Sequence, residues 1–520
     1  MNEFIQRHQD SVTGMLSGFD RLRIRGTLRL LSYVRGMGQY LGLLKVLLKD
    51  FKQYALATTD EIRRATIELA QSAGRPLPYL NRSTVNKESP ARTIAERDGI
   101  REGLIAVLSC VEPCRSYEVH RNRQLKQLEL QSKPTKCLHY YFYLIHPRWG
   151  LMHLRLQTWF PFVVQVCLNG REWLARQMDA AGLGYLRREN CFVQLEDLAR
   201  AQRLANNQLR VNWPRELDRL LAWVHPSHRR IFRRQPVPYY WSIEQSEWAT
   251  DVMFRSPRAL AAIYPRLLQH GIGYLGSRDV MRFLGRKLPA HGGLHGRFAG
   301  EVVSDLRQRP EGLRIKHRLN TNSIKMYDKC GSVLRVETTL NNTQDIKVYR
   351  AKEGDRGGQK DWRVLRKSVA DLHRRVVVCQ KANERYLASL ATVAETTTLG
   401  HLAEPLCRPV IWQGRRVRAL NPLSAEDARL LEAVNRGEFA VNGFRNRDLR
   451  PLLFGRTDDP QQRRRASAAV TRRLRLLRAH GLIHKVPKTH RYVVSKKGQT
   501  AITAFLAAWT ADTAKLAAAA

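Results

Sequence analysis

The segments LRIKHRLNTNSIKMYDK (residues 313–329) and SVLRVETTL (residues 332–340) decide the fold class of this chain. Both are rich in the β-branched and aromatic residues that are typical of strands. Cys330 and Gly331 separate them, and a glycine at this point permits a tight hairpin turn. We therefore expect a β-hairpin over residues 313–341, within a multidomain α+β protein.

Strand and helix patterns extend outward from this hairpin in both directions. From Leu104 onward, short segments rich in Val, Ile, Tyr, Phe and Trp are broken by Asn, Pro and Gly, as in a sheet. Apolar residues at helical spacing, mixed with Arg and Lys, favour helices over residues 19–51 and 59–73. The sequence thus predicts a basic helical domain over 1–90, a mixed sheet with helices over 100–215, an α/β segment over 216–350, a helical connector over 351–420 and a winged helix-turn-helix over 421–520.

The charge balance indicates a polyanionic partner. Lys and Arg total 89 against 46 Asp and Glu, a formal net charge of +43. Such an excess repels itself unless a polyanion neutralises it, and the guanidinium group of arginine suits phosphates and guanine edges. DNA is the expected partner and RNA is the alternative. The oligomeric state is not predicted.

Neither a membrane span nor a signal segment is expected. No apolar run approaches the roughly 20 residues that a transmembrane helix needs. The first residues, MNEFIQRHQD, are polar and lack the apolar segment of a signal peptide. We therefore expect a cytoplasmic protein, associated with the nucleoid if its ligand is DNA, without a membrane partner.

The last hundred residues have the pattern of three helices followed by a two-stranded wing. Residues 424–438, 444–455 and 460–481 favour helices, and residues 482–502 favour strand, basic turn and strand. In the third helix Val470, Leu474 and Leu477 share one face and should pack inward. The expected nucleic-acid contacts are Arg464, Ser467, Thr471, Arg472 and Arg475 on the outer face of this helix, with Lys485, Lys488, His490 and Arg491 in the wing.

The segment LRLLRAHGLIHKVPKTHRYVVSKKG (residues 474–498) resembles the helix-to-wing segment of MarR-like winged-helix DNA-binding domains. The helix, the GLI start of the wing and the RYVVSKKG exit occur in the order of that family. The resemblance covers only the terminal domain. It implies a helix that reads the major groove of DNA, while RNA binding and protein contacts are the alternatives.

Candidate catalytic residues lie in the central hairpin. Asp328 and Glu337 stand on its two strands, where they could hold Mg²⁺, a hard cation that prefers carboxylate oxygen. Asp251, in the strand-like segment WATDVMF, is the third expected ligand. Tyr327 or Tyr349 would be the nucleophile in metal-assisted phosphodiester chemistry. The alternative is a structural hairpin with salt-bridged carboxylates.

Three further carboxylates are secondary candidates. Glu244 and Glu247 stand three residues apart and would share one face if their segment were helical. Asp20, in GFDRLRIRGT, is expected to pair with a neighbouring arginine.

The motif YDK (residues 327–329), followed by RVE (residues 335–337), resembles a strand pair of rolling-circle replication initiators. In those proteins a tyrosine attacks the phosphate. Their metal-binding pair of histidines, separated by one apolar residue, is missing from this sequence, which puts nicking in doubt.

A zinc site is the less favoured metal hypothesis. Cys110, Cys114, His120 and Cys137 supply the ligand types that zinc prefers, but their spacing departs from common zinc fingers. Cysteines in strands are more commonly buried as small apolar residues. Magnesium rather than zinc is therefore the expected cofactor.

Together these features predict a DNA-processing or DNA-maintenance factor of a mobile element or replicon. The winged helix would select the site, and the central body would cleave or transfer a strand with a metal ion. Two alternatives remain open at this point: a non-catalytic MarR-like transcriptional regulator and an RNA-binding component of a ribonucleoprotein.

Overall fold

The chain is an α+β protein with two compact units in the computed structural model. The structure describes residues 3–286, 300–309, 312–352, 355, 358–391, 399–436, 439, 443–487 and 489–509. The larger unit contains the described parts of Met1–Ile272, Phe283–Arg286 and Val302–Leu387, and the smaller contains Gly273–Arg282 and the described parts of Lys287–Glu301 and Ala388–Ala520. Within the described residues, no helix has the length and apolar character needed to cross a bilayer.

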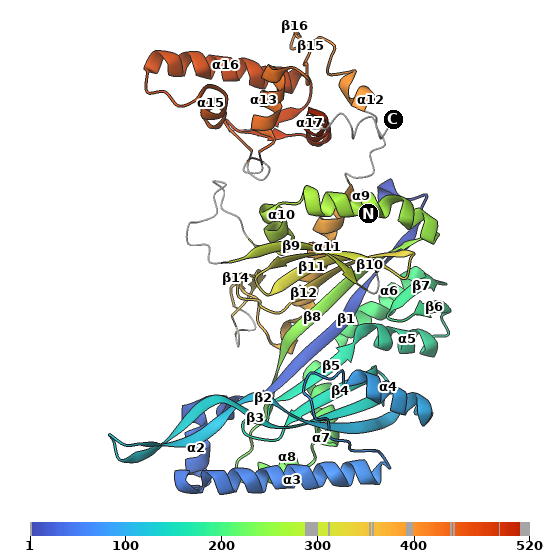
Figure 1. The fold of residues 1–520 in the computed structure, drawn as a ribbon, viewed down its shortest axis with the longest axis vertical. Coiled ribbons are helices and arrows are strands. Elements are labelled where there is room, and N and C mark those ends of the chain that lie inside the picture. Colours follow the sequence, from blue (N-terminus) through green and yellow to red (C-terminus); the bar gives the residue numbers. More distant parts are fainter. Residues whose placement is uncertain are drawn as a thin grey trace. The chain divides into compact units, whose positions relative to one another are not determined.

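Ten of the described strands form one antiparallel sheet in the larger unit (Figure 1). From edge to edge they are β2 (Gly103–Asn122), β3 (Gln127–His146), β4 (Gly150–Gln157), β5 (Val164–Asn169), β1 (Val12–Leu28), β8 (Tyr239–Phe254), β12 (Val333–Leu340), β11 (Asn322–Lys329), β10 (Gly312–Leu319) and β9 (Val302–Arg309). The sheet therefore runs through both of the predicted segments 100–215 and 216–350, which share one architecture.

The predicted hairpin is present, with one strand more than expected. The segment 313–329 turns at Asn320 and so contributes both β10 and β11. Cys330 and Gly331 have φ values of 60° and 82° and connect β11 to β12. Lys329 pairs with Val333, so Ser332 completes a three-residue connection, and glycine adopts a positive φ there without strain.

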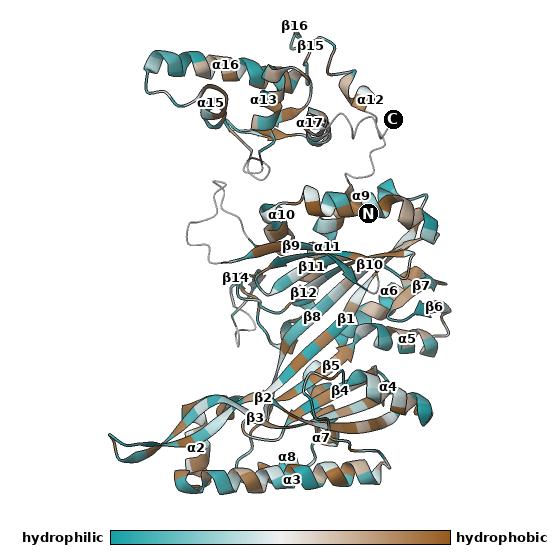
Figure 2. Cartoon of the chain, in the orientation of Figure 1, coloured by the Kyte–Doolittle hydropathy of each residue, from teal (hydrophilic) through white to brown (hydrophobic). Residues whose placement is uncertain are grey.

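The N-terminal segment that was expected to be helical contains β1, a central strand of the sheet. Leu22, Ile24 and Leu28 are buried, whereas Arg21 and Arg25 on the alternate positions are exposed. This period of two belongs to a strand with one buried face. Figure 2 shows the same alternation of apolar and polar residues along strands of this sheet.

The helix α11 (Leu372–Leu390) packs on one face of the sheet. Trp248 donates its indole hydrogen to Gln380 at 2.7 Å, and Thr338 donates to Asn383 at 2.6 Å. The described α-helices within residues 3–286 are α1 (Glu3–Arg7), α2 (Val34–Leu43), α3 (Phe51–Ser72), α4 (Glu88–Arg97), α5 (Gly170–Ala180), α6 (Leu198–Asn206), α7 (Trp213–Val224), α8 (Ser227–Ile231), α9 (Pro257–Gly273) and α10 (Ser277–Phe283).

Short hairpins stand outside the main sheet. They are β6 (Tyr185–Arg188) with β7 (Cys191–Leu195), β13 (Lys347–Arg350) with β14 (Asp361–Val364), and β15 (Val410–Trp412) with β16 (Arg415–Val417). The prediction of a helical connector over 351–420 is therefore only partly right, because β14, β15 and β16 lie in this range beside α11.

The smaller unit contains α12 (Leu399–Ala403), α13 (Ala425–Val434), α15 (Asn446–Phe454), α16 (Pro460–Ala479), β17 (Ile483–Lys485), β18 (Tyr492–Val494) and α17 (Lys496–Trp509). The Ser424 side chain caps α13 by accepting the Asp427 amide hydrogen at 3.2 Å. Val470, Leu474 and Leu477 of α16 are buried in the core of this unit, as the spacing predicts.

Candidate functional site

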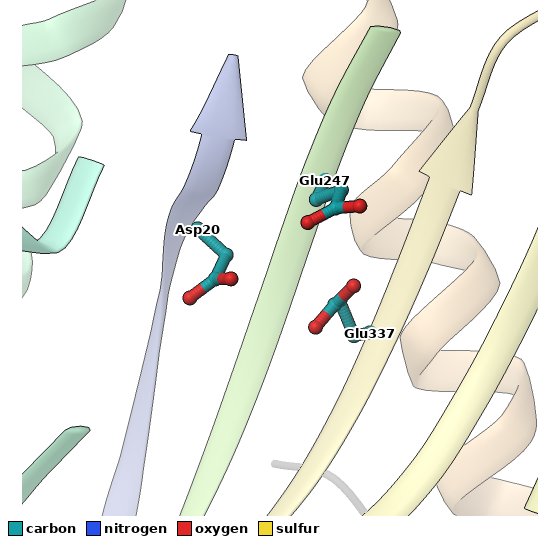
Figure 3. A group of neighbouring side chains, drawn as sticks. All are labelled: Asp20, Glu247 and Glu337. Carbon is teal, nitrogen blue, oxygen red and sulfur yellow. The ribbon is translucent and has the colours of Figure 1, made fainter. Parts of the chain in front are cut away.

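Three carboxylates from three neighbouring strands converge on one face of the larger sheet (Figure 3). Asp20 comes from β1, Glu247 from β8 and Glu337 from β12, and one oxygen of each lies within 4.8 Å of the others. We call these residues the acidic cluster. Their side chains are 13%, 12% and 2% exposed, respectively. The cluster is thus nearly buried but still reached by solvent.

A β-bulge places Asp20 in this cluster. Phe19 pairs with Trp248 and Arg21 pairs with Glu247, so Asp20 is an extra residue of β1 without a partner on β8. A bulge of this kind re-aims a side chain, and bulges are common beside active sites. The Asp20 carboxylate therefore lies beside Glu247 and Glu337 without disrupting the ladder on either side.

A second bulge in the same ladder presents another carboxylate. Glu244 is the extra residue of β8 where the register shifts again between Arg23 and Ile24. Its carboxylate accepts a hydrogen bond from Gln165 and lies 3.7 Å from Nη1 of Arg25. The extra residues of both bulges are therefore acidic side chains on the same face.

Cationic and hydroxyl groups of β11 face the cluster directly. Lys325 and Glu337 are register partners, and the lysine Nζ lies 2.6 Å from Glu337 and 3.9 Å from Glu247. The Tyr327 hydroxyl donates to Glu337 at 3.0 Å. An ammonium group thus lies against two carboxylates, where a divalent cation would also be attracted.

A buried ion network supports the cluster from one side. Arg335 binds both oxygens of Asp251, at 2.6 and 2.9 Å, and its third nitrogen binds Asp20 at 2.9 Å. Arg171 of α5 lies 2.9 Å from Asp251, and Asn190 donates to Asp20 at 2.6 Å. Because Asp251 and Arg335 are almost fully buried, this network fixes the orientation of Asp20.

The pKa values of the cluster carboxylates are shifted, upward for Asp20 and Glu247 and downward for Glu337. Burial raises the pKa of Asp20 despite the opposing charge of Arg335, and burial together with nearby Glu337 raises the pKa of Glu247. Burial alone would raise the pKa of Glu337 as well, but the Lys325 ammonium holds it below its usual range. Negative charge is therefore disfavoured on Asp20 and Glu247, a condition that a bound cation would relieve.

The predicted grouping of Asp251, Asp328 and Glu337 is wrong in two respects. Asp328 pairs with Leu334, so strand alternation points it away from the face that carries Glu337. Asp251 lies on the face of Glu337, but its oxygens are bound by Arg335 and Arg171. Glu337 remains in the site, and its neighbours are Asp20 and Glu247.

The prediction of Tyr327 as a nucleophile does not fit its surroundings. Its side chain is almost completely buried, and its hydroxyl hydrogen is donated to Glu337. Burial and the adjacent Glu337 charge raise its pKa well above the usual value. Tyr327 is therefore a neutral hydrogen-bond donor that orients Glu337. Tyr349, the other tyrosine considered, lies on β13 outside the cluster.

Basic side chains flank the acidic cluster on the same face of the sheet. The strand register places Arg314, Lys316, Arg318, Arg21, Arg23, Arg25 and Arg155 there, and we call them the basic face. Burial and the charges of Lys325, Arg314 and Arg318 lower the pKa of Lys316. Positive charges therefore crowd one another on this face, which favours a polyanion as ligand.

The predicted zinc ligands do not gather into one site. Cys114 and Cys137 lie with their sulfur atoms 3.2 Å apart on β2 and β3. His120 pairs with Glu129 farther along the same ladder, and Cys110 contacts the Val111 carbonyl oxygen. Only two of the four residues thus meet, whereas a structural zinc ion needs four ligands.

The predicted contacts in the smaller unit differ in their surroundings. Arg464, Thr471, Arg472, Lys485 and His490 are exposed, Ser467, Arg475 and Arg491 are partly exposed, and Lys488 lies outside the described residues. Asn446 of α15 binds Thr471 at 2.9 Å and also contacts Ser467, so these two residues hold α15 to α16. The Arg475 guanidinium lies 6.0 Å from the centre of the Trp412 ring. Among the predicted contacts on α16, Arg464 and Arg472 are therefore the most open to a ligand.

Sequence patterns carry part of the signal for Glu247 and Asp20, which the sequence indicated only as secondary candidates. In EWATD, read as a strand, Glu247 and Asp251 lie on one face because they are an even number of residues apart. The alternation RLRIR would likewise have identified β1. A bulge has no comparable signature, so the position of Asp20 among the ligands required the structure.

Comparison of the chain with family models, with curated proteins and with solved structures finds no match in any of the three.

Proposed function

We propose that this chain binds nucleic acid along the basic face and cleaves or transfers a phosphodiester bond at the acidic cluster with the help of a divalent cation. One observation carries the proposal: three carboxylates within coordinating reach of one another lie on a face that also carries many Arg and Lys side chains. Basic side chains would bind the backbone phosphates on both sides of the cluster.

The spacing of the carboxylates suits magnesium or manganese. Magnesium binds oxygen at about 2.1 Å, so two oxygens on opposite sides of one ion are about 4.2 Å apart. The oxygens of Asp20, Glu247 and Glu337 already lie within 4.8 Å of one another. A cation bound there would polarise a phosphate oxygen and lower the pKa of a coordinated water.

The residues around the carboxylates have distinct roles in this proposal. Arg335 and Asn190 orient Asp20, and Tyr327 orients Glu337. Lys325 would give up its contact with Glu247 when a cation binds, and its ammonium group would then be available to a phosphate oxygen. Positive charge at that point would stabilise the negative charge that develops in the transition state.

The smaller unit fits a reader of duplex DNA. The helices α13, α15 and α16, followed by the β17–β18 pair, support a MarR-like winged helix, with Arg464 and Arg472 on the helix that would enter the major groove. A unit that recognises a DNA site, in one chain with a unit that cleaves or transfers strands, suits a DNA-processing or maintenance factor of a mobile element or replicon.

A cleavage assay with the full chain tests the proposal. Labelled single-stranded DNA, duplex DNA and RNA are incubated with the protein in Mg²⁺, Mn²⁺ or EDTA. We expect cleavage or strand transfer only with a divalent cation, and a loss of at least about 100-fold in Glu247→Gln and Glu337→Gln. Glu96→Gln, an exposed position of α4, is the matched control. Equal rates in EDTA, or full activity of both cluster variants, would overturn the proposal.

A non-catalytic binding function is the second candidate, because Lys325 and Arg335 already offset part of the negative charge of the cluster. It predicts tight binding without cleavage in any metal, and no change of the unfolding temperature with Mg²⁺ or Mn²⁺. Competition between duplex DNA and structured RNA over a range of salt would separate a DNA regulator from an RNA-binding protein.

A further inference from the structure

The strands β2 and β3 continue beyond their neighbours in the sheet as a two-stranded ribbon (Figure 1). The strand β4 pairs with β3 only from His139 onward, whereas the pairing of β2 with β3 continues to Asn122 and Gln127. Val119 and Leu130 are the last pair that packs against the core of the larger unit. Residues 120–129, which we call the ribbon tip, therefore project from the packed part of this unit.

Hydrogen bonds order the turn of the ribbon tip. The side-chain oxygen of Asn122 accepts the amide hydrogens of Gln124 and Leu125, both at 3.1 Å. The side-chain nitrogen of Asn122 donates to Glu129 on the opposite strand at 2.8 Å. A turn that is already ordered loses less entropy when a ligand binds to it.

Positive charge is concentrated on the ribbon. Residues 115–136 contain six Lys or Arg and two Glu. All six basic side chains are exposed: Arg115, Arg121, Arg123, Lys126, Lys133 and Lys136. Lys133 pairs with Glu118, whereas no carboxylate of the described residues forms an ion pair with Arg121, Arg123 or Lys126. The cations nearest the turn are therefore available to a polyanion.

The dimensions of the ribbon tip suit the major groove of B-form DNA. Two paired strands lie about 4.8 Å apart, and a groove about 12 Å wide admits such a ribbon with its side chains. Each strand continues for three residues beyond Val119 and Leu130, or about 10 Å, which is comparable with a groove depth of about 8.5 Å. The major groove of an RNA duplex is too deep and narrow for side chains to read. Shape therefore favours a DNA duplex over an RNA duplex.

We propose that the ribbon tip inserts into the major groove of duplex DNA, where Arg121, Arg123 and Lys126 bind backbone phosphates. Gln124 and Gln127 are exposed on the same tip, and their amide groups would reach base edges. The inference rests on the proposed function and deepens it, because it names a duplex segment as part of the ligand, in addition to the strand held on the basic face.

The test measures binding of the full chain by fluorescence anisotropy over a range of salt. The probes are a labelled DNA duplex and a labelled RNA duplex of the same sequence and length. The test variant combines Arg121→Ala, Arg123→Ala and Lys126→Ala. A charge-retaining variant combines Arg121→Lys, Arg123→Lys and Lys126→Arg. The matched control removes three exposed cations elsewhere in the same unit, by Lys49→Ala, Lys52→Ala and Arg64→Ala.

We expect the test variant to bind the DNA duplex at least about tenfold more weakly, with a plot of log affinity against log salt that is shallower by about three units. Its binding to the RNA duplex should change by less than about threefold, because the ribbon does not enter that groove. The charge-retaining variant and the matched control should keep the salt dependence of the wild type.

Unchanged binding of the test variant to the DNA duplex would overturn the inference, and so would equal losses on the DNA and RNA duplexes. If Lys316→Ala together with Arg318→Ala still weakens binding in that case, the proposed function survives without the ribbon contact.

Discussion

Arg335 and Asp251 form a buried bidentate ion pair, with nitrogen–oxygen distances of 2.6 and 2.9 Å. The third nitrogen of the same guanidinium group binds Asp20 at 2.9 Å. The pair therefore supports the acidic cluster without being part of it. This assigns Asp251 a positioning role and separates its substitution from substitutions at Glu247 and Glu337.

Replacing Asp251 should damage the fold. Asp251→Asn removes the charge that balances Arg335 and Arg171 in the interior, and breaking a buried pair in this way costs about 3–5 kcal/mol. Urea unfolding of the full chain should show a large loss of stability relative to the wild type. Glu96→Gln should unfold at the same urea concentration as the wild type. An Asp251→Asn variant of normal stability would contradict the supporting role of this residue.

Replacing Glu247 should stabilise the folded chain at neutral pH. Burial and Glu337 raise the pKa of Glu247, so the folded chain retains a proton that the unfolded chain releases. Stability is therefore lost as pH rises from the ordinary glutamate pKa through the raised one. In EDTA, Glu247→Gln should be more stable than the wild type at neutral pH, by on the order of 1 kcal/mol, and the difference should shrink under acid.

Magnesium should make the wild type more stable than Glu247→Gln. A cation bound by the cluster stabilises the wild type in proportion to its occupancy, whereas Glu247→Gln lacks one ligand. Unfolding temperatures measured with increasing Mg²⁺ or Mn²⁺ should rise for the wild type and change little for the variant. Parallel curves for the two proteins would place any bound metal somewhere other than the acidic cluster.

The basic face should govern the salt dependence of binding. Lys316→Ala and Arg318→Ala each remove one expected phosphate contact, so the plot of log affinity against log salt should become shallower by about one unit for each. The loss should be similar for all nucleic-acid sequences. Lys52→Ala, at an exposed position of α3, is the control and should leave the slope unchanged. Unaltered slopes in both variants would exclude this face as the binding surface.

The helix α16 should contribute affinity for duplex DNA. Arg472→Ala removes an exposed guanidinium group and should weaken binding to a preferred duplex by about 1–3 kcal/mol if the residue contacts a base. Arg478→Ala, whose guanidinium lies 4.9 Å from the centre of the Trp412 ring, is a control within the same helix and should have a smaller effect. Equal effects of the two substitutions on all sequences would argue for a general electrostatic contribution.

Local patterns in the sequence predicted the α+β class and several single elements. The hairpin at Cys330–Gly331 and the buried positions Val470, Leu474 and Leu477 were correct, because each depends on a turn residue or a period within a single element. The first strand was missed since its apolar and arginine residues were interpreted with a helical period. Tertiary pairing with β5 and β8, which the sequence does not show, decides between the two.

The candidate site was harder to predict than the fold. Glu337 was identified, but Asp328 was assigned as its partner because the two are neighbours along the hairpin. Strand alternation places the side chains of Asp328 and Glu337 on opposite faces. The actual neighbours of Glu337 are Asp20 and Glu247, which are both distant from it in the sequence. Their meeting depends on the order of strands in the sheet and on a bulge, neither of which is a local property.

The bulge also makes the Asp20 carboxylate separable from the strand that carries it. Phe19 and Arg21 already oppose adjacent residues of β8, so excising Asp20 alone would leave an unbroken ladder with every other side chain on its present side. A single-codon insertion or deletion at this point would therefore add or remove a charged group while the scaffold is preserved. Evolution could therefore add or remove this carboxylate through variants that all still fold.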